Sequence, residues 1–457
     1  MPAFAPEKLA TWTGGSWTRI PGGALTGFNQ DTRTLGAGQV FVALKTDKRD
    51  GHDFLSAAQQ GGAVAALTGR EVPGATLPQL VTPDPLAAFQ RIAREHRREF
   101  HGTVVGVTGS AGKTSTKDLL ALLLGDSPDV LATEGNLNNY LGVPLTLTRL
   151  DPAHRAAVIE AGINMPGEMA ALAQMIEPDH SVVTLVAPAH LEKLGSVEGV
   201  AVEKAQLPAA NRAGGLAVFP ASCWVHESFR ALANPLVLVP EADAKTKLAA
   251  RTVKFGVFHR PDRTEVSFEG RRRFVLRRVS PGMAQNAALA LTLASELGVK
   301  DIALQARLEH WQPSRWRGEM RQHGEATVYC DFYNANPASM ADAMDAFNAA
   351  VGGDLPRLYV LGSMEELGPD SADYHRQLGR LLHLRKGDFL FTLGSQAAAL
   401  REGLLENGND PASVAVVAGV APIRERLAGF KGAVFLKGSR RYQLETVLDA
   451  NPVAHAH

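Results

Sequence analysis

The chain has 457 residues, a length that predicts two to four domains with substantial hydrophobic cores. Its 47 lysine and arginine residues balance 47 aspartate and glutamate residues, which argues against an overall charge that attracts nucleic acid or an anionic membrane. Cys223 and Cys330 have no metal-ligand spacing and imply a reducing compartment. We find no signal-peptide pattern and no apolar run near the ~20 residues of a membrane helix, so we expect a soluble, cytoplasmic protein.

The first predicted domain spans residues 1–100. Short apolar runs at residues 39–44 and 63–67 are typical of strands, and a charged segment at residues 85–100 is typical of a helix. The helix closes this domain, because an apolar β-branched run begins at residue 103.

A glycine-rich loop, Gly106-Val-Thr-Gly-Ser-Ala-Gly-Lys-Thr114, is the most informative feature of the chain. It joins the run at residues 103–107 to a leucine-rich segment, residues 119–124, that is predicted to be helical. Backbone N–H groups and the helix dipole at such a junction attract phosphate, and Lys113 adds a positive charge. Val107 stands where the common pattern has its first glycine, so the loop is a variant. The candidate nucleotide-binding residues are Gly109, Ser110, Ala111, Gly112, Lys113, Thr114 and Ser115. The alternative is a glycine-rich turn without a ligand.

The second predicted domain spans residues 101–311. Apolar β runs at residues 156–160, 181–186 and 215–219 alternate with helical stretches, which indicates a parallel sheet with crossover helices. A helix at residues 287–297 is expected to end at Gly298.

Polar side chains cluster after these strands. Glu160 ends one strand and is well placed to hold Mg²⁺ opposite the glycine-rich loop. His190 follows another strand, and Lys204 lies in a helical stretch. The segment Thr133-Glu-Gly-Asn-Leu-Asn-Asn139 is rich in amides that suit a polar ligand. Taken singly, each has an ordinary alternative: a solvated carboxylate, a structural histidine, an exposed lysine and an Asn-rich turn.

The third predicted domain spans residues 312–457 and repeats strand and helix regularly. Strands are predicted at residues 327–332, 357–361, 389–393, 414–417 and 433–436, with helices such as 339–350 and 374–384 between them. This pattern indicates a doubly wound, Rossmann-like domain, although the Gly-x-Gly-x-x-Gly pattern of dinucleotide binding is absent. The basic run Arg271–Arg278 is interpreted as a solvated strand face rather than a polyanion site.

In combination, these motifs resemble the Mur ligase family in order and spacing. The resemblance covers nearly the whole chain and rests on the glycine-rich loop, the amide-rich loop with Gly142-Val-Pro144, Glu160-Ala-Gly162 with Pro166-Gly-Glu168, Pro188-Ala-His-Leu-Glu192 with Gly195, Arg317, Asp331-Phe-Tyr-Asn-Ala-Asn-Pro337 and Lys437-Gly-Ser-Arg440. Asp31-Thr-Arg33, residues 38–44, Asp50-Gly-His-Asp-Phe54 and the Tyr333-Asn-Ala-Asn-Pro337 form are similar to the branch of the family that ligates D-alanyl-D-alanine.

The resemblance implies three α/β domains: a UDP-sugar substrate-binding domain at 1–100, a central P-loop ATP-binding domain with a parallel sheet at 101–311, and a C-terminal Rossmann-like domain at 312–457 that binds the incoming amine. In this family ATP activates a carboxylate as an acyl phosphate, and an amine then displaces phosphate to form an amide. The expected substrates are UDP-N-acetylmuramoyl-tripeptide and D-alanyl-D-alanine, with ATP and Mg²⁺ as cofactors. We expect a monomer that acts in peptidoglycan precursor synthesis.

The same resemblance assigns roles to single residues. Lys113, Glu160, His190 and Lys204 match the catalytic set. Thr114 and Glu160 would hold one Mg²⁺ and His190 would help to hold a second, while Lys204 matches a carbamylated lysine that bridges metal ions. Contacts to ATP are implied for Asn286, Arg317 and Asp331, and contacts to the UDP-muramoyl peptide for Thr32, Arg33, Asn138 and Asn139.

The sequence departs from the family pattern in three places. Gly282-Met283 replaces a His-Asn pair before Asn286, Leu185 replaces an asparagine upstream of His190, and Ser363 replaces an aspartate in Gly362-Ser-Met-Glu-Glu-Leu-Gly368. Two alternatives therefore stay open: another Mur-like ligase that joins an amine to a carboxylate such as a folate, and a nucleotide-binding homologue without activity. The N-terminal motifs argue against the first, and the retained Lys113, Glu160, His190 and Lys204 argue against the second.

Overall fold

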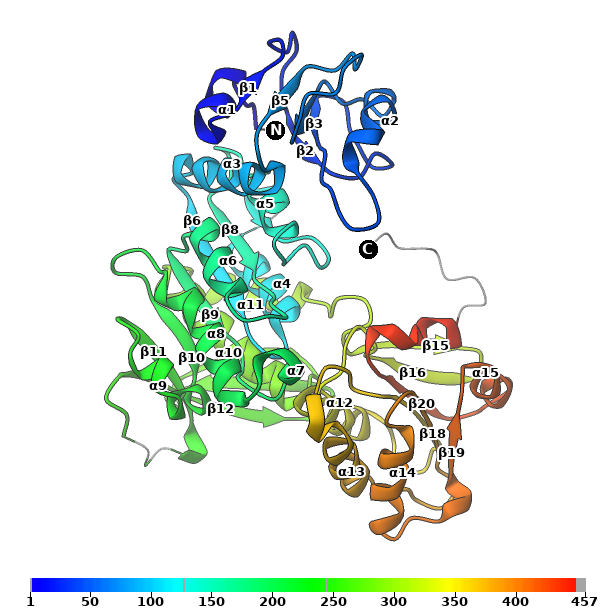
Figure 1. Cartoon of the computed structure of the whole chain (residues 1–457). Helices are drawn as coiled ribbons and strands as arrows, with labels where there is room; N and C mark the ends of the chain where they lie inside the picture. Colours follow the sequence, from blue (N-terminus) through cyan, green and yellow to red (C-terminus); the bar gives the residue numbers. More distant parts are fainter. Residues whose placement is uncertain (1, 126–127, 244, 246, 449–457) are drawn as a thin grey trace.

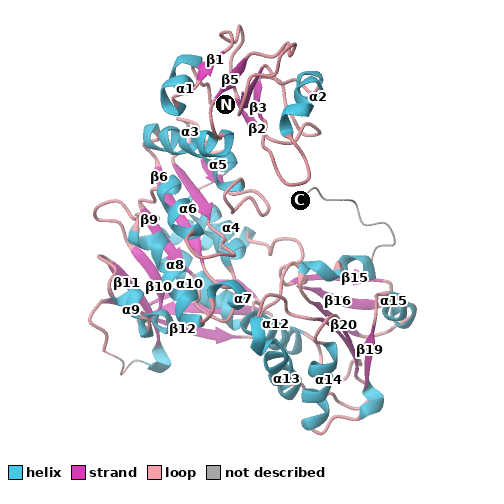
Figure 2. Cartoon of the chain, viewed as in Figure 1, coloured by secondary structure: helices cyan, strands magenta, loops and turns pink. Residues whose placement is uncertain are grey.

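A computed structural model describes residues 2–125, 128–243, 245 and 247–448 of the chain. Within these residues the strands form three sheets, each flanked by helices (Figure 1, Figure 2). The sheets follow one another in sequence, and the part in the middle of the chain lies between the other two (Figure 1). The fold is therefore α/β in three parts, as the sequence predicts, and we call them the N-terminal, central and C-terminal parts.

The N-terminal part has a five-stranded sheet with the order β1-β5-β4-β3-β2, parallel except for β1. Its elements are α1 (Pro6–Thr13), β1 (Ser16–Trp17), β2 (Gly27–Asn29), β3 (Gln39–Val42), α2 (Leu55–Gln60), β4 (Ala65–Thr68), β5 (Gln79–Val81) and α3 (Pro85–Glu99). The predicted strands and helix occur here with their ends shifted by at most two residues.

The central part has a nine-stranded sheet with the order β14-β13-β12-β11-β10-β9-β6-β8-β7. Its strands are β6 (Thr103–Thr108), β7 (Val130–Ala132), β8 (Ala156–Glu160), β9 (His180–Val183), β10 (Ala217–Pro220), β11 (Pro235–Pro240), β12 (Arg251–His259), β13 (Arg263–Phe268) and β14 (Arg272–Arg277). Strands β6 to β12 are parallel, and the predicted parallel sheet is extended by the antiparallel strands β13 and β14. The basic run is thus an edge strand, where Arg272 pairs with Asp301, in agreement with the strand-face interpretation.

Helices cover both faces of the central sheet (Figure 2). They are α4 (Lys113–Leu124), α5 (Gly142–Leu147), α6 (Glu168–Ile176), α7 (Leu191–Leu194), α8 (Val197–Ala209), α9 (Glu227–Arg230), α10 (Pro281–Glu296) and α11 (Asp301–His310). Helix α10 begins six residues before its predicted start, because Ser280 caps it by accepting a hydrogen bond from Met283 N at 3.0 Å and Pro281 suits the first turn.

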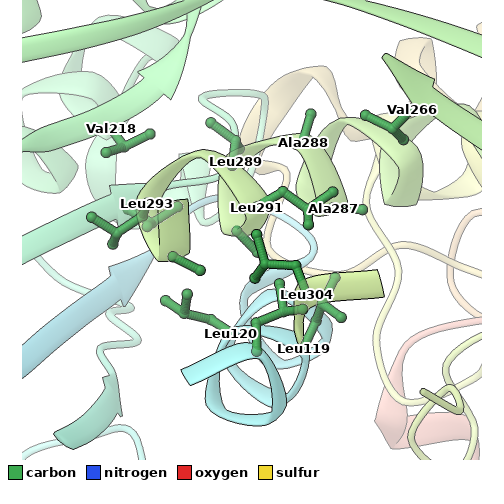
Figure 3. Packing of buried hydrophobic residues seen from close by; sticks show 14 of the residues in the cluster. Leu119, Leu120, Val218, Val266, Ala287, Ala288, Leu289, Leu291, Leu293 and Leu304 are labelled. Atoms are coloured by element: carbon green, nitrogen blue, oxygen red, sulfur yellow. The ribbon is translucent and has the colours of Figure 1, made fainter. Parts of the chain in front are cut away.

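The core of the central part is built around α10, which is apolar on nearly every side. Leu289, Leu291 and Leu293 are fully buried, and α10 packs against Leu119 and Leu120 of α4 (Figure 3). A helix that is buried all round fixes its neighbours on each side, since protein interiors are close-packed. This packing sets the position of α4, whose first turn carries the end of the glycine-rich loop.

The C-terminal part has a six-stranded sheet with the order β15-β16-β20-β17-β18-β19, parallel except for β15. Its elements are β15 (Glu319–His323), β16 (Ala326–Cys330), α12 (Pro337–Ala350), β17 (Arg357–Gly362), α13 (Ser371–Leu381), β18 (Phe389–Leu393), α14 (Ala397–Glu406), β19 (Val414–Val417), α15 (Ala421–Leu427) and β20 (Ala433–Lys437). Helices α12, α13 and α14 cover one face and α15 the other, so the doubly wound prediction is confirmed. The predicted helix at 374–384 ends earlier, because Leu382 is already extended.

The predicted domain boundaries fall between α3 and β6 and between α11 and β15. Among the described residues no helix is both long and apolar enough to cross a membrane.

A buried arginine joins α3 to the central part. Arg97 is fully buried, and its guanidinium donates to Ile176 O at 2.9 Å, to Glu177 O at 2.8 Å and to Asp179 Oδ2 at 2.9 Å. Burial lowers the Arg97 pKa to about 10, so the group stays charged at neutral pH. Removing it would take the donor from the carbonyls of Ile176 and Glu177 and the buried positive charge from Asp179, which Val104 N would still contact.

We therefore expect Arg97→Leu to lower the free energy of unfolding by roughly 3–5 kcal/mol. Arg98→Leu is the matched control, because Arg98 is on the same helix and pairs with Glu177 at 2.6 Å with its side chain 47% exposed. An exposed pair contributes about 1 kcal/mol at most. Urea unfolding followed by circular dichroism measures both variants, and equal shifts of the midpoint would contradict this role of Arg97.

Candidate active site

The glycine-rich loop is held in a conformation that only small residues permit. Gly109 has φ 151° and Gly112 has φ 75°, and a Cβ at either position would collide with the Thr184 hydroxyl or the Asn286 side-chain amide. Gly112 is the residue before α4, so the loop delivers its backbone N–H groups to a helix N-terminus. The sequence prediction of a phosphate cradle therefore matches the local geometry.

The loop is also tied to the segment after β9. Ser110 N donates to Leu185 O at 2.8 Å, and Ser110 Oγ donates to Ala187 O at 2.8 Å. The predicted strand at 181–186 ends at Val183, because the following residues turn toward the loop to make these bonds. The departure at Leu185 leaves this tie intact, since only the backbone carbonyl of that residue takes part.

A buried carboxylate lies directly opposite the loop. Glu160, at the carboxyl end of β8, accepts hydrogen bonds from Thr114 Oγ1 at 2.8 Å and from Asn138 Nδ2 at 2.7 Å. It is 1% exposed, and its backbone N–H donates to Thr133 Oγ1 at 2.9 Å. Two predicted neighbours from different segments thus converge on the two oxygens of one carboxylate.

Two buried lysines lie near the loop, and one of them, Lys113, also feels the charge of this carboxylate. Lys113 Nζ donates to Gly109 O at 3.0 Å, and burial lowers its pKa despite the opposing influence of Glu160. Lys204, on α8, is 1% exposed, and burial, followed by the charge of Lys113, lowers its pKa far below the usual lysine range. The prediction of a helical Lys204 is confirmed, but the exposed-lysine alternative is wrong for this residue.

His190 lies at the mouth of the same region, immediately before α7. Its backbone has φ 54°, and its Nδ1 is hydrogen-bonded to Glu366 Oε2 of the C-terminal part. Glu366 is a residue that sequence reasoning missed, although it stands in the Gly362–Gly368 motif that the sequence singled out.

The C-terminal part closes over the loop through several polar side chains. Asn336 Nδ2 donates to Ser110 O at 2.9 Å, and Asp342 accepts from Gly282 N at 2.6 Å. Burial raises the pKa of Asp342. The replacement of His-Asn by Gly282-Met283 thus leaves a backbone amide for Asp342, and a side chain at Gly282 would press on that carboxylate.

Arg317 and Asp331 are each fixed by a neighbour in the C-terminal part. The Arg317 guanidinium lies over the Tyr333 ring at 4.1 Å, and Lys437 Nζ donates to Asp331 Oδ2 at 2.6 Å. Lys437 is 1% exposed and ends β20. The sequence analysis singled out Asp331 and the motif that begins at Lys437, but it did not predict that these two residues pair.

These groups surround a cavity of about 750 Å³ between the central and C-terminal parts. The predicted site residues that line it are Ser110, Ala111, Gly112, Lys113, Thr114, Ser115, Asn138, Asn139, Glu160, His190, Asn286, Arg317 and Asp331. Gly109 lies in the loop beneath them, and Lys204 is buried close to Lys113. Thr32 and Arg33 lie elsewhere, after β2 in the N-terminal part, where Arg33 pairs with Asp31 at 2.5 Å.

A second, larger cavity of about 910 Å³ lies on the other side of α4 and is lined by Lys117, Asp118 and Arg149 among others. It contacts Thr114 and Arg317, whereas Lys113, Glu160 and Asp331 line the smaller cavity. The smaller cavity is the candidate active site, because the phosphate cradle and the buried carboxylate both face it.

Few side chains at the cavity could serve as ligands of a metal ion. The described part of the chain has no group of three or more His, Cys, Asp or Glu side chains placed to hold a metal. Thr114 Oγ1 and the Glu160 carboxylate nevertheless present oxygen atoms beside a phosphate cradle. Mg²⁺ prefers such oxygens and takes its other ligands from phosphate and water, so these residues fit Mg²⁺ bound together with a nucleotide.

Comparisons with known proteins cover nearly the whole chain. Residues 107–293 match the Mur ligase middle domain, and residues 316–440 match the Mur ligase glutamate ligase domain. The UDP-N-acetylmuramoyl-tripeptide–D-alanyl-D-alanine ligases of Haemophilus influenzae and Escherichia coli are each 32% identical to this chain over 92% of both proteins.

Solved structures agree with these sequence matches. A crystal structure of MurF from Acinetobacter baumannii superimposes with a TM-score of 0.85 at 25% identity and covers 98% of each chain. The structure of MurF ligase from Thermotoga maritima in complex with ADP gives a TM-score of 0.77 at 27% identity, over 93% of this chain and 96% of that one.

Gly112 provides a test of the cradle. We expect Gly112→Ala to abolish ATP binding, since the new Cβ would displace Asn286 and strain a left-handed backbone. Gly167→Ala is the matched control. Gly167 also stands directly before a helix and has φ 83°, but a Cβ at this position would have no other atom within 4 Å. Isothermal titration with ATP measures both, and equal affinities in the two variants would rule out the proposed fit of the loop.

Proposed function

Because the chain belongs to the Mur ligase family, with the D-alanyl-D-alanine ligases as its relatives over most of its length, we propose that the cavity between the central and C-terminal parts is where it forms an amide bond. The chain is an ATP-dependent ligase of peptidoglycan precursor synthesis, joining D-alanyl-D-alanine to UDP-N-acetylmuramoyl-tripeptide. The observation that supports the location best is Glu160, which is buried opposite the phosphate cradle and hydrogen-bonded to Thr114 and Asn138.

The reaction brings several negative charges together. In the first step, an oxygen of the tripeptide carboxylate forms a bond to the γ-phosphorus of ATP, and ADP leaves. Lys113 lies where the terminal phosphates meet the cradle, and at ~4 Å with an effective dielectric of ~20 one opposite charge contributes roughly 4 kcal/mol of Coulomb energy. Phosphate binding would also favour the charged form of the Lys113 amine, whose pKa burial lowers.

Mg²⁺ would be held by Thr114 and Glu160 and would neutralise charge on the phosphates. His190 is proposed to contribute to a second site beside it. Asn138 and Asn139 line the cavity, and we propose that their amides hold the peptide in place.

In the second step, the amine of D-alanyl-D-alanine attacks the acyl carbon, the C–O bond to phosphate breaks, and the amine loses a proton. We propose that the C-terminal part presents this dipeptide, because the carboxyl ends of β16, β17 and β20 face the cavity side, where a doubly wound sheet binds its ligands. Asn286, Arg317 and Asp331 are proposed to contact ATP, which agrees with their position around the cavity.

The proposed division of labour follows the predicted boundaries: residues 1–100 bind the UDP-sugar, 101–311 bind ATP and 312–457 bind the amine. We propose a monomer as the active form. We propose a cytoplasmic location, because ATP and a UDP-linked precursor are its substrates.

Phosphate release measured with and without each substrate tests the activity. We expect release only when ATP, UDP-N-acetylmuramoyl-tripeptide and D-alanyl-D-alanine are all present. Release driven by a folate and glutamate would instead indicate a different Mur-like ligase, and nucleotide binding without any release would indicate an inactive homologue.

Arg33 tests the role of the N-terminal part. We expect Arg33→Ala to raise the KM for UDP-N-acetylmuramoyl-tripeptide and to leave the KM for ATP unchanged, because an exposed guanidinium suits a phosphate or carboxylate. Arg19→Ala is the control, since Arg19 follows β1, at the opposite end of the sheet from Arg33. Steady-state kinetics separate the two constants, and an equal rise in both for Arg33→Ala would refute this assignment.

Lys204 tests the role of the charge that is buried beside Lys113. We expect Lys204→Ala to be nearly inactive and to regain part of its activity with added short carboxylic acids, because a buried neutral amine can carry a carbamate that the acid replaces. Lys204→Arg should stay inactive when these acids are added, since arginine introduces a permanent cation. Lys193→Ala, an exposed lysine near His190, is the control and should keep normal activity. Full activity of Lys204→Ala without any added acid would overturn the assignment.

A further inference from the structure

Two residues with unusual backbone conformations meet where the central and C-terminal parts come together. His190 has φ 54° and Glu366 has φ 64°. The left-handed region is uncommon for residues other than glycine, and such conformations collect at sites where function requires them. Their meeting across two parts of the chain is therefore a feature to be explained.

The contact between them involves both side chains and backbone. His190 Nδ1 is hydrogen-bonded to Glu366 Oε2, and Glu192 N donates to Glu366 O at 3.2 Å. Gly368 lies against the backbone of Glu192 on the same side. The start of α7 is thus docked on the Gly362–Gly368 loop at more than one point.

The loop that carries Glu366 is itself fixed. His375, which is fully buried, accepts a hydrogen bond from Met364 N at 2.9 Å, and Ser439 Oγ accepts one from Glu365 N at 3.1 Å. Ser363 N donates to Leu393 O at 2.9 Å. The Glu366 carboxylate is therefore presented from a held backbone rather than from a free loop.

The hydrogen bond determines which nitrogen of the imidazole carries a proton. Glu366 Oε2 is the atom that meets His190 Nδ1, and a carboxylate oxygen accepts a hydrogen bond rather than donating one. His190 must then donate from Nδ1, so Nε2 is the ring nitrogen that remains for another partner. His190 lines the cavity and Glu366 lies outside that lining, so Nε2 is the nitrogen left for the cavity.

We propose that Glu366 is a positioning residue of the ligation reaction, which fixes the His190 ring with Nδ1 protonated and Nε2 available to the phosphate end of the cavity. A carboxylate behind a histidine is a general device for holding the ring and its proton in place. Because Glu366 belongs to the C-terminal part, the docking of that part completes the site around His190. This inference rests on the proposed function, since it assigns His190 a role in that reaction.

The protonation state of the ring is the direct test, and it requires neither ligand nor activity. In ¹⁵N-histidine-labelled protein, two-bond nitrogen–proton correlations distinguish the two neutral forms, and the His190→Asn spectrum identifies the His190 signals. We expect Nδ1-protonated His190 in the parent and in Glu366→Gln, which keeps an acceptor. Glu366→Gly, which suits a positive φ, should shift His190 toward the Nε2-protonated form. Glu192→Gln removes a nearby exposed carboxylate and should leave the signals unchanged.

Kinetics provide the second test. We expect Glu366→Gly to lower kcat by about 10- to 100-fold with little change in the KM for ATP, as loss of a group behind a functional histidine typically does. Glu366→Gln should retain more of kcat than Glu366→Gly, and Glu192→Gln should retain all of it. An unchanged His190 signal in Glu366→Gly, or equal kcat in Glu366→Gly and the parent, would overturn the proposal. If the parent itself forms no amide, the proposed function fails, and the kinetic part of this proposal fails with it, whereas the His190 spectra still test the contact.

Discussion

The buried carboxylate of Glu160 is the constraint on which the cavity depends. A buried charge is tolerated only when hydrogen bonds or opposite charges compensate it, and here Thr114 and Asn138 each satisfy one oxygen. Glu160 ends β8, Thr114 lies in the first turn of α4, and Asn138 follows β7. These three segments meet because β8 lies between β6 and β7 in the sheet. The strand order, more than any single residue, therefore creates the place where phosphate and carboxylate are brought together.

The C-terminal part approaches this centre through a small number of polar contacts. Asn336 reaches Ser110, Asp342 reaches the amide of Gly282, and Glu366 reaches His190. Polar contacts of this kind can be broken and remade more readily than a packed apolar surface, which suits a domain that opens to admit substrate and closes before the chemistry. Each contact falls on a residue at or next to the nucleotide loop or the cavity, so the docking of the C-terminal part completes the cavity.

Sequence patterns predicted the elements well where an apolar run had its own boundaries. The strands at 156–160, 389–393 and 414–417 occur with their predicted bounds, since turn residues end each of them. Elements defined by tertiary contacts were predicted less well. The strand after residue 180 stops early because the chain turns to bond the glycine-rich loop, and β13 and β14 extend the sheet as an antiparallel pair.

The sequence by itself determined the α/β class, the phosphate cradle and the residue types of the site, because glycine, lysine and strand-end carboxylates carry their chemistry with them. Only the tertiary structure decided which groups act on one another. It buried Lys204 inside the central part. It also paired residues that are far apart in the chain: Lys437 with Asp331, and Glu366 with His190. Such pairings depend on strand order and domain docking, and the charge state of a buried group depends on its surroundings, which local sequence does not specify.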